Sequence, residues 1–347
     1  MSAADIPSGI GRARRGEGGP RGKSWTKPIA ATLSLTALLV SLALAQRPAE
    51  AADVQAPARS GDAALQQQLL KASAFAPKRG VFFEVSNAFN KVYLFGTIHA
   101  GKPEFYPLDT AVTRALASSS RVVLELDFTD PAIADKVAQA GRYPPGASLD
   151  GTLPPALMRR VESAMSRYGV SAAEIKGKKP WAITVELLSL ETEKLGYSSM
   201  FASDLYLAAI ATLFDKPISG LESADEQIAV FDGMSDDEQR ASLEDTLAAL
   251  EDGRGKAEIE AMVSAWASAD PAALAAGLER AVADAPPGVR ALQRRLFDQR
   301  NELMAERIEA IVRSRQPAFV AIGAAHLVGR DSVVELLRKK GLTVRAP

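Results

Sequence analysis

The sequence of 347 residues contains no cysteine and only two histidines. Without a thiol, the chain cannot form disulfide bonds, thiolate metal sites or a cysteine nucleophile. Its formal net charge of −1 gives no basic excess of the kind that marks nucleic-acid binding, so nucleic acid is not an expected partner. The His-Glu-x-x-His, Gly-x-Ser-x-Gly and Walker signatures are also missing, and the zincin, α/β-hydrolase and P-loop interpretations lose their support.

The N-terminal residues 1–51 are typical of an export signal. Six Lys and Arg residues in the first 27 precede an uncharged run rich in Ala and Leu at residues 29–45, and small-x-small sites end at Ala45 and Ala51. Left uncut, the run is long enough to anchor the chain in a membrane. We therefore expect a periplasmic or otherwise exported protein. It would contact a membrane only through this N-terminal segment, and only if the segment is not cleaved.

The rest of the chain predicts a linker and one domain. Residues 52–75 are rich in Ala, Pro, Gln and Ser and predict the linker, and residues 76–347 predict the domain. Its fold class is α/β in the mixed α+β sense: a central mixed sheet, surrounding helices and a large helical insert at residues 131–316. Short apolar runs predict the strands, at residues 81–85, 91–96 (a hairpin with the first), 121–126, 216–221, 318–322 and 342–345.

Both histidines occupy the same Gly-x-x-His frame, Gly96 to His99 and Gly323 to His326. Because Gly makes up about 7% of residues, two chance matches at one offset would occur roughly once in 200. Each Gly ends an apolar run, so each histidine should follow the carboxyl end of a strand, where open α/β sheets bind ligands. We expect the two imidazoles to meet in one site; the alternative is two satisfied histidines in unrelated turns.

Two carboxylates occupy places that need an explanation. Glu125 lies within the apolar run Val-Val-Leu-Glu-Leu-Asp, and a buried carboxylate needs a partner; Asp127 shares its face by the two-residue period. The alternative is an edge strand that leaves Glu125 exposed. Glu222 directly follows a predicted strand, as the histidines do. Its alternative role is a carboxylate in the first turn of a helix, favoured by the helix dipole.

A polar pair also interrupts the apolar stripe of the helix predicted at residues 289–315. Arg300 and Asn301 are spaced three or four residues from apolar neighbours on either side, so both fall within the stripe. An arginine at the edge of the stripe could simply extend its charge to solvent. An adjacent Arg-Asn pair instead indicates buried partners, and a carboxylate of the site would satisfy Arg300 in a two-pronged hydrogen bond.

Together these residues resemble the TraB/GumN family, which includes the TIKI metalloproteases of animals, over nearly all of residues 80–347. The resemblance is carried by residues 93–99 (Tyr-Leu-Phe-Gly-Thr-Ile-His), 106–108 (Tyr-Pro-Leu), 123–127 (Val-Leu-Glu-Leu-Asp), 179–181 (Lys-Pro-Trp), 216–222 (Lys-Pro-Ile-Ser-Gly-Leu-Glu), 226–227 (Glu-Gln), 300–301 (Arg-Asn) and 320–329 (Val-Ala-Ile-Gly-Ala-Ala-His-Leu-Val-Gly). One departure is Ala202-Ser203-Asp204, where the family often has Gly-x-Asp.

The resemblance implies a fold related to the erythromycin-esterase and ChaN-like proteins, and a site that includes His99, Glu125 and His326. It fixes the fold better than the reaction. TIKI members look like divalent-metal-dependent peptidases, and esterase relatives look like they use a His general base. ChaN-like relatives bind haem, and TraB-type members are known as regulators.

We therefore predict an exported, metal-dependent, peptidase-like hydrolase that acts on a peptide or small acyl substrate. A divalent ion (Mn, Co or Zn) would be held by His99, His326, Glu125 and Glu222, because imidazoles with carboxylates and open positions suit a catalytic ion. Glu222 would be the general base or a further ligand. Arg300, with Asn301 beside it, would complete the catalytic site.

Two alternatives stay open. In a metal-free hydrolase, His99 would be the general base, a carboxylate would orient its ring, and Arg300 would steady developing negative charge. In an exported haem-binding, metal-binding or regulatory protein, the histidines would hold a ligand without turnover.

Overall fold

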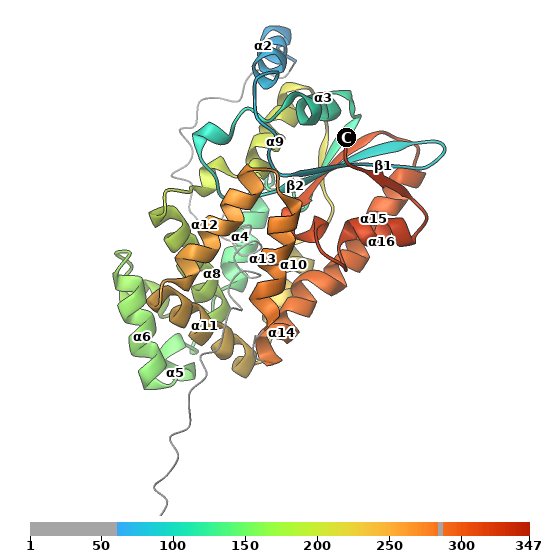
Figure 1. Cartoon of the computed structure of the whole chain (residues 1–347). Helices are drawn as coiled ribbons and strands as arrows, with labels where there is room; N and C mark the ends of the chain where they lie inside the picture. Colours follow the sequence, from blue (N-terminus) through green and yellow to red (C-terminus); the bar gives the residue numbers. More distant parts are fainter. Residues whose placement is uncertain (1–60, 284–286) are drawn as a thin grey trace, which may run out of the picture.

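A six-stranded mixed sheet forms the centre of the protein in a computed structural model, which describes residues 61–283 and 287–347 (Figure 1). The order of the strands across the sheet is β4-β3-β5-β2-β1-β6. The predicted fold class, a central mixed sheet with surrounding helices, is confirmed. The strands are β1 (Val81–Ser86), β2 (Lys91–Thr97), β3 (Arg121–Leu124), β4 (Ile218–Gly220), β5 (Ala318–Gly323) and β6 (Thr343–Arg345).

Four of these strands, β4, β3, β5 and β2, run parallel, so their carboxyl ends lie at one edge of the sheet. β1 returns antiparallel to β2 as the predicted hairpin, and β6 pairs with β1. β5 lies between β3 and β2, and all six of its residues are buried. Burial on both faces explains its unbroken apolar sequence, Ala-Phe-Val-Ala-Ile-Gly.

Helices cover both faces of the sheet. In Figure 1, α3 (Thr110–Ser118) and α9 (Ser203–Leu213) lie above it, and α15 (Gln299–Arg313) and α16 (Val333–Lys339) lie below it. α9 is almost wholly apolar along its sequence because it is buried between the sheet and its neighbours. The two faces thus receive helices from different parts of the chain, and the carboxyl edge of the sheet stays between them.

Most helices between β3 and β5 form a separate layer to the lower left of the sheet in Figure 1. Capping boxes start α10 and α11 at Ser223 and Ser235, and Pro opens α4, α6 and α8. These helices are α4 (Pro131–Ala140), α5 (Leu149–Thr152), α6 (Pro155–Ser166), α7 (Ala172–Ile175), α8 (Pro180–Lys194), α10 (Ala224–Asp232), α11 (Asp236–Glu251), α12 (Arg254–Ala267), α13 (Pro271–Ala283) and α14 (Pro287–Gln293).

Short turns complete the chain around the site. They are the 3₁₀ turns η1 (Pro103–Phe105), η2 (Ser199–Phe201) and η4 (Ala324–Leu327), and the π-helical turn η3 (Arg294–Asp298). η3 lies between α14 and α15, so the single helix predicted at residues 289–315 is continuous in direction but not in hydrogen bonding. π turns inside helices often occur at functional sites.

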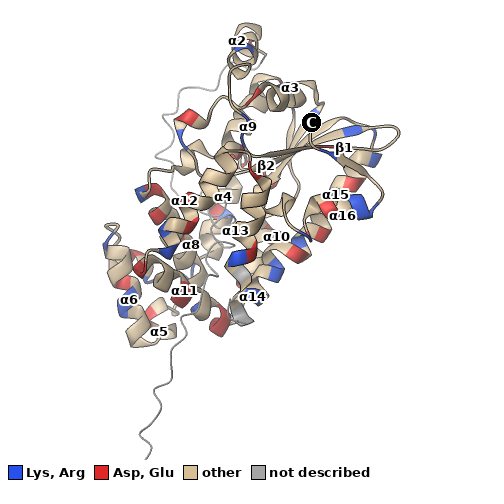
Figure 2. Ribbon diagram, viewed as in Figure 1, with Lys and Arg blue, Asp and Glu red and all other residues tan. Residues whose placement is uncertain are grey.

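The charged residues of the helical layer are mixed rather than segregated, and Figure 2 shows both signs over the same helices. Exposed pairs such as Lys136–Asp225 and Arg160–Glu251 span neighbouring helices. Such pairs contribute about 0–1 kcal/mol each because solvent screens them. Most of the stability must therefore come from the apolar core, which includes the fully buried Trp266 of α12.

The structure corrects two details of the predicted elements. β3 ends at Leu124 rather than at residue 126, because the short β4 pairs only with residues 122–124. Part of the predicted linker, residues 52–75, is the helix α2 (Ala63–Ser73), which Asp62 caps. The predicted export signal, residues 1–51, lies outside the described residues. Within the ranges that are described, no helix is long and apolar enough to cross a membrane.

Candidate functional site

The two Gly-x-x-His frames lie side by side at the carboxyl edge of the sheet. β2 and β5 are direct neighbours, and Thr97 of β2 pairs with Gly323 of β5. His99 and His326 are both buried. A Cβ placed on Gly323 would lie 3.6 Å from His99 Nε2, 3.6 Å from His326 Cδ2 and 3.3 Å from Glu125 Oε2. Three predicted site residues therefore border one point next to Gly323.

His99 is held by a buried carboxylate. Its Nδ1 lies 2.8 Å from Oδ2 of Asp204, in the first turn of α9, and Asp204 is fully buried. A carboxylate only accepts, so Nδ1 carries the proton of this hydrogen bond. The neighbouring Ser203 hydroxyl accepts from the backbone N–H of Ile98 at 2.8 Å, which fixes the start of α9 against the frame. Within the described part of the chain, Nε2 of His99 has no hydrogen-bond partner.

His326 is held by an amide instead. Its Nδ1 lies 2.6 Å from Oδ1 of Asn301, whose Nδ2 donates to the carbonyl of Asp331 at 2.8 Å. That second bond fixes the orientation of the amide, so Nδ1 of His326 is the donor and Nε2 the acceptor. Arg300 Nη1 lies 3.3 Å from this Nε2, and the ring packs on Phe297 at 5.1 Å between centroids.

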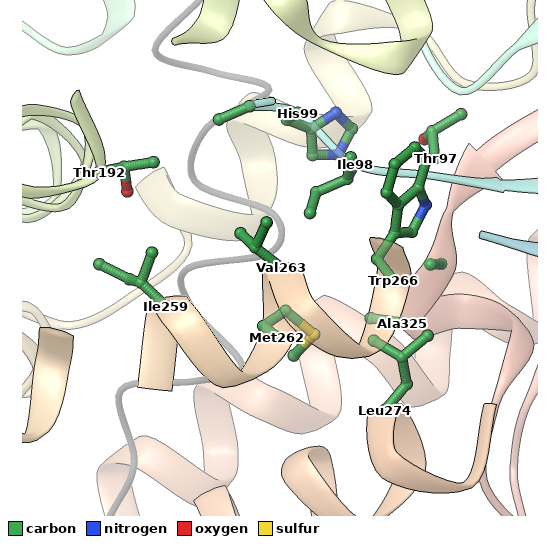
Figure 3. Close-up of a pocket in the computed structure, with 12 residues that line it drawn as sticks. Thr97, Ile98, His99, Thr192, Ile259, Met262, Val263, Trp266, Leu274 and Ala325 are labelled. Atoms are coloured by element: carbon green, nitrogen blue, oxygen red, sulfur yellow. The ribbon is translucent and has the colours of Figure 1, made fainter. Parts of the chain in front are cut away.

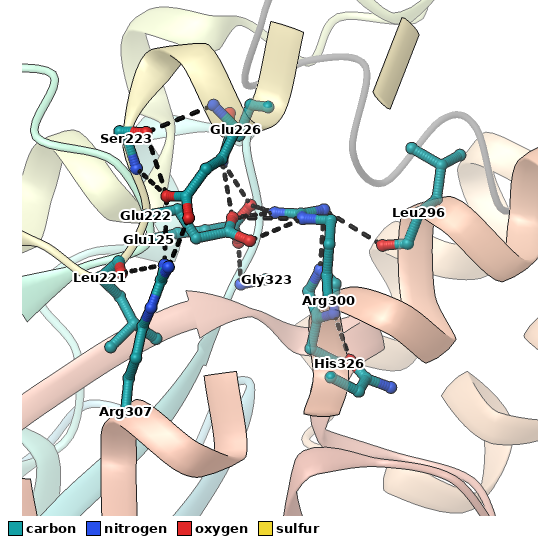
Figure 4. Close-up of polar contacts among 12 residues, drawn as sticks. Glu125, Leu221, Glu222, Ser223, Glu226, Leu296, Arg300, Arg307, Gly323 and His326 are labelled. Atoms are coloured by element: carbon teal, nitrogen blue, oxygen red, sulfur yellow. Dashed lines mark hydrogen bonds and ion pairs between the residues drawn. The ribbon is translucent and has the colours of Figure 1, made fainter. Parts of the chain in front are cut away.

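Arg300 joins two carboxylates at the centre of the site (Figure 4). Its Nη2 donates to Glu125 Oε1 at 2.7 Å, and its Nε and Nη2 both donate to Glu222. All three side chains are buried. The alternative of an arginine that reaches solvent is therefore wrong, and so is the alternative of an exposed Glu125. Charge-assisted bonds of this kind are roughly twice as strong as neutral ones.

The π-helical turn η3 shapes the surroundings of Arg300. Arg300 Nη1 donates to the carbonyl of Leu296, at 3.2 Å, inside that turn. The backbone N–H of Gln299 bonds the carbonyl of Arg294, five residues back, so the regular four-residue ladder is interrupted here. The bond to the Leu296 carbonyl within this turn helps to fix the direction of the guanidinium.

Gln227 of α10 completes the network. Its amide donates to Glu125 Oε1 at 3.1 Å and to Glu222 Oε2 at 3.2 Å, while the Gly323 N–H donates to Glu125 Oε2 at 2.8 Å. Each oxygen of Glu125 thus accepts from a different element of the fold. Both oxygens of Glu222 accept hydrogen bonds from Arg300, so Glu222 acts here as the partner of that arginine.

The electrostatic environments of the two histidines differ. Burial lowers the pKa of His99, but the charge and hydrogen bond of Asp204 and the charge of Glu125 outweigh it and leave the pKa raised above 6.5. Burial and the positive charge of Arg300 lower the pKa of His326 to about 3. Burial alone would raise the pKa of Glu125, yet Arg300 and the two imidazoles hold it at about 2.

The site can be compared with what a divalent ion needs. Within residues 61–283 and 287–347, no three His, Asp or Glu side chains form a group that could hold a metal ion. The guanidinium of Arg300 lies among the donors and bonds both Glu125 and Glu222. These contacts compete with an ion for the same oxygens.

The kinds of donor nevertheless suit an ion. His99 Nε2 is buried without a partner, and it borders the same point as Glu125 and His326. Both rings are oriented through Nδ1 by Asp204 or Asn301, which is how metal-binding histidines are usually held. The donor types thus match those of a divalent ion, but only His99 Nε2 is free to bind one, because Arg300 contacts His326 Nε2 and both oxygens of Glu125 accept hydrogen bonds.

Sequence reasoning missed two members of this network, Asp204 and Gln227. Asp204 was noted only as the residue left from the family's Gly-x-Asp, and its carboxylate at the start of an apolar helix was the available signal. Gln227 directly follows Glu226 of the α10 capping box, and the Glu-Gln segment of the resemblance did not indicate its role in the site. Asp127, which was predicted to share the face of Glu125, bonds Thr129 in the following loop instead.

A pocket opens beside His99. Its lining comes from the end of β2, from α12 and from the turn that carries His326, as Figure 3 shows. His99 is the only titratable side chain among the lining residues, and the rest are mainly Ile, Met, Val, Leu, Ala and Trp. The site thus combines a buried charged network with an apolar entrance.

Comparisons with known proteins agree with the sequence resemblance. The TraB/PrgY/gumN family model matches residues 81–346. The uncharacterized protein YbaP of Escherichia coli is 24% identical over 71% of this chain and 87% of its own length. The metalloprotease TIKI2 of Danio rerio is 25% identical, over 88% of this chain and 67% of its own length.

The human metalloprotease TIKI1 is 24% identical over 73% of this chain, which spans 59% of that relative. No solved structure gave a significant match. The family match covers the sheet, the helical layer and every residue of the network around Arg300. The chain belongs to the TraB/PrgY/gumN family.

Proposed function

We propose that this protein is a hydrolase of a peptide or another acyl bond, and that its reaction is centred on His99 Nε2. The observation that carries the proposal is the buried His99–Asp204 pair, whose ring nitrogen Nε2 has no partner among the described residues. An imidazole oriented by a carboxylate is a strong base or ligand, and leaving its second nitrogen unpaired in the interior costs free energy. The distant relatives named as metalloproteases support the same reaction class.

We further propose that His99, His326 and Glu125 hold a divalent ion, Mn, Co or Zn. When bound, such an ion lowers the pKa of a water molecule and polarises a carbonyl. Asp204 keeps the His99 ring in the tautomer that presents Nε2, and Asn301 does the same for His326. Arg300 helps to hold the pKa of Glu125 low, and its positive charge would stabilise a developing oxyanion.

A metal-free mechanism would use the same residues, and the contact of Arg300 with Glu125 and Glu222 favours it. Arg300 already neutralises both carboxylates, so His99 can act as the general base without an ion. In that case Asp204 raises the basicity of the His99 ring, and His99 Nε2 accepts the proton of the attacking water. Arg300 then stabilises negative charge on the substrate oxygen.

The two mechanisms are separated by activity assays with and without metal. Peptide and ester libraries are screened with added Mn²⁺, Co²⁺ or Zn²⁺, then after exhaustive chelation. His99→Ala and His326→Ala should each lower turnover by at least about 10²-fold to 10⁴-fold, while the circular dichroism spectrum stays that of the wild type. Arg313→Ala, an exposed change on α15, is the control.

The outcomes select among the alternatives. Loss on chelation and recovery with one ion supports the metal site. Activity that survives chelation but needs His99 supports the general-base mechanism. If no substrate turns over with any ion, while the purified protein shows a haem absorbance band or binds a partner protein tightly, the exported binding protein or regulator is the correct interpretation.

We also propose that the protein is exported and cleaved after Ala45 or Ala51. The order of basic, apolar and small-residue regions at the N-terminus supports this. Mass spectrometry of the mature protein tests it, and an intact N-terminus on a membrane-bound protein would favour an anchor instead.

A further inference from the structure

The pocket beside His99 is enclosed by apolar side chains on two sides (Figure 3). One wall is a face of α12, and its residues Ile259, Met262 and Val263 lie within one or two helical turns of each other. The opposite wall is Ile98, inside the first Gly-x-x-His frame, and Leu274 of α13 closes the base. His99 is the only lining residue that carries a charge in any protonation state.

Two buried polar atoms at this pocket have no partner in the described part of the chain. They are Nε2 of His99 and Oγ1 of Thr97, and these side chains are 2% and 3% exposed. Buried polar atoms are nearly always satisfied in folded proteins, so each such exception needs an explanation. Both residues line the same pocket, and a ligand with a polar group next to an apolar one would satisfy them.

The α12 wall is fixed to the sheet rather than loosely packed. Trp266 Nε1 donates to the carbonyl of Gly96 at 2.8 Å, and the Trp266 carbonyl accepts from Gly80 N–H at 2.7 Å. The indole also contacts the rings of Phe95 and Phe105. The pocket is therefore preformed, and little ordering has to accompany binding.

From these features we infer that the pocket is the specificity site of the proposed hydrolase, and that it takes an uncharged, branched aliphatic side chain next to the bond that is cleaved. That the bound group belongs to a substrate rests on the proposed function. The pocket and the chemistry of the group it binds do not depend on that function. A charged side chain would be desolvated here without a partner. The free volume of about 40 Å³ suits a small group, because one water needs about 10–15 Å³.

Binding is tested without turnover. The exported domain is titrated with N-acetyl-leucinamide, N-acetyl-alaninamide and N-acetyl-lysinamide while the indole N–H signal of Trp266 is followed by NMR. We expect the leucine probe to shift the signal and to bind more tightly than the alanine probe, by roughly fourfold for each further methylene buried. The lysine probe should not shift it.

Variants place the binding in this pocket. Val263→Phe fills the space and should abolish the response to the leucine probe, and Val263→Ala enlarges it and should admit N-acetyl-phenylalaninamide. Ala261→Phe adds the same ring to the exposed face of α12 and should leave leucine binding unchanged. If Val263→Phe fails to fold, the Val263→Ala shift and the wild-type probe series still decide the question.

The peptide library separates this inference from the proposed function. Turnover that prefers Val, Leu or Ile beside the cleaved bond through KM, and that loses the preference in Val263→Ala, supports both. Turnover that ignores the side chain, with no probe shifting Trp266, overturns the pocket inference and leaves the hydrolase standing. Tight binding of the leucine probe with no turnover of any substrate keeps the pocket and overturns the hydrolase.

Discussion

His99 and His326 leave neighbouring parallel strands at the same edge of the sheet, within the same four-residue frame. Each ring donates through Nδ1, but the acceptor is the carboxylate of Asp204 for one and the amide of Asn301 for the other. Nε2 of His99 has no partner among the described residues, whereas Nε2 of His326 faces Arg300. Two Gly-x-x-His frames thus place their imidazoles in two different hydrogen-bonding and charge environments.

The difference teaches that the contacts made through tertiary packing, rather than the motif, decide what a histidine can do. A charged acceptor stabilises the imidazolium form and raises the basicity of His99. A neutral acceptor with a guanidinium nearby leaves His326 as a neutral ring with an oriented lone pair. One frame is suited to accept a proton or bind an ion, and the other is suited only to bind or to position.

The largest expected effect is the separation of the two titrations. After chelation, ¹⁵N-histidine NMR should show one ring that stays neutral toward pH 3 and one that is protonated below a pKa above 6.5. That is a difference of more than about a thousandfold in proton affinity. The chain has only two histidines, so His99→Ala assigns both signals. Two rings that titrate within one pH unit of each other would contradict the comparison.

The same shifts give opposite contributions to stability. The raised pKa of His99 stabilises the fold below pH 6.5, and this contribution is lost as the pH rises through the folded pKa. His326 stays neutral while the unfolded chain takes up a proton, so acidification from pH 6.5 to about 3 destabilises the fold, by up to about 1.4 kcal/mol per unit. Denaturant melts between pH 6.5 and 3 should show that the His326→Gln protein loses less free energy of unfolding on acidification than the wild type.

Arg300→Ala should give the next largest effect. It leaves Glu125 and Glu222 buried without a counter-charge, at a cost of about 3–5 kcal/mol in the free energy of unfolding. It should also raise the pKa of His326, because a positive charge beside that ring is lost. Denaturant melts measure the first effect and NMR the second.

A matched control exists on the same helix. Arg313 is paired with Glu309 at an exposed position of α15, so Arg313→Ala should change stability by no more than about 0.5 kcal/mol. An Arg300→Ala protein as stable and active as this control would show that the buried network is unimportant.

Asp204→Asn should act mainly on the His99 frame. It keeps the shape of the side chain but removes its charge, so the pKa of His99 should fall and turnover should drop by about 10²-fold. The titration of His326 should not move. Asp127→Asn, outside the network, is the control and should leave kcat unchanged. Equal losses in both variants would argue against a special role for Asp204.

The smallest expected effect comes from making the second frame like the first. Asn301→Asp places a carboxylate against His326 Nδ1, and the pKa of that ring should rise by on the order of one to two units. The NMR titration used for the wild type measures it, with Asn301→Leu as the uncharged comparison. If His326 does not respond, Arg300 alone sets its protonation.

Much of this arrangement could be predicted from the sequence because it follows from local chemistry. An apolar run stopped by Gly predicts a strand end, and two such runs bearing histidine predicted that His99 and His326 would lie near each other. Glu125, Arg300 and Asn301 stood out because a buried polar group must find a partner. Each of these inferences needs only a few neighbouring residues.

The tertiary structure decided which partners meet. Asp204 reaches His99 from 105 residues away because α9 begins against the end of β2, and no local pattern distinguishes that meeting from one with His326. Arg300 bonds two carboxylates because Glu125 and Glu222 follow the neighbouring strands β3 and β4, while the Leu296 carbonyl in η3 also accepts from the guanidinium. Protonation followed from these contacts, because a pKa reflects the charges and burial around a group rather than the motif that contains it.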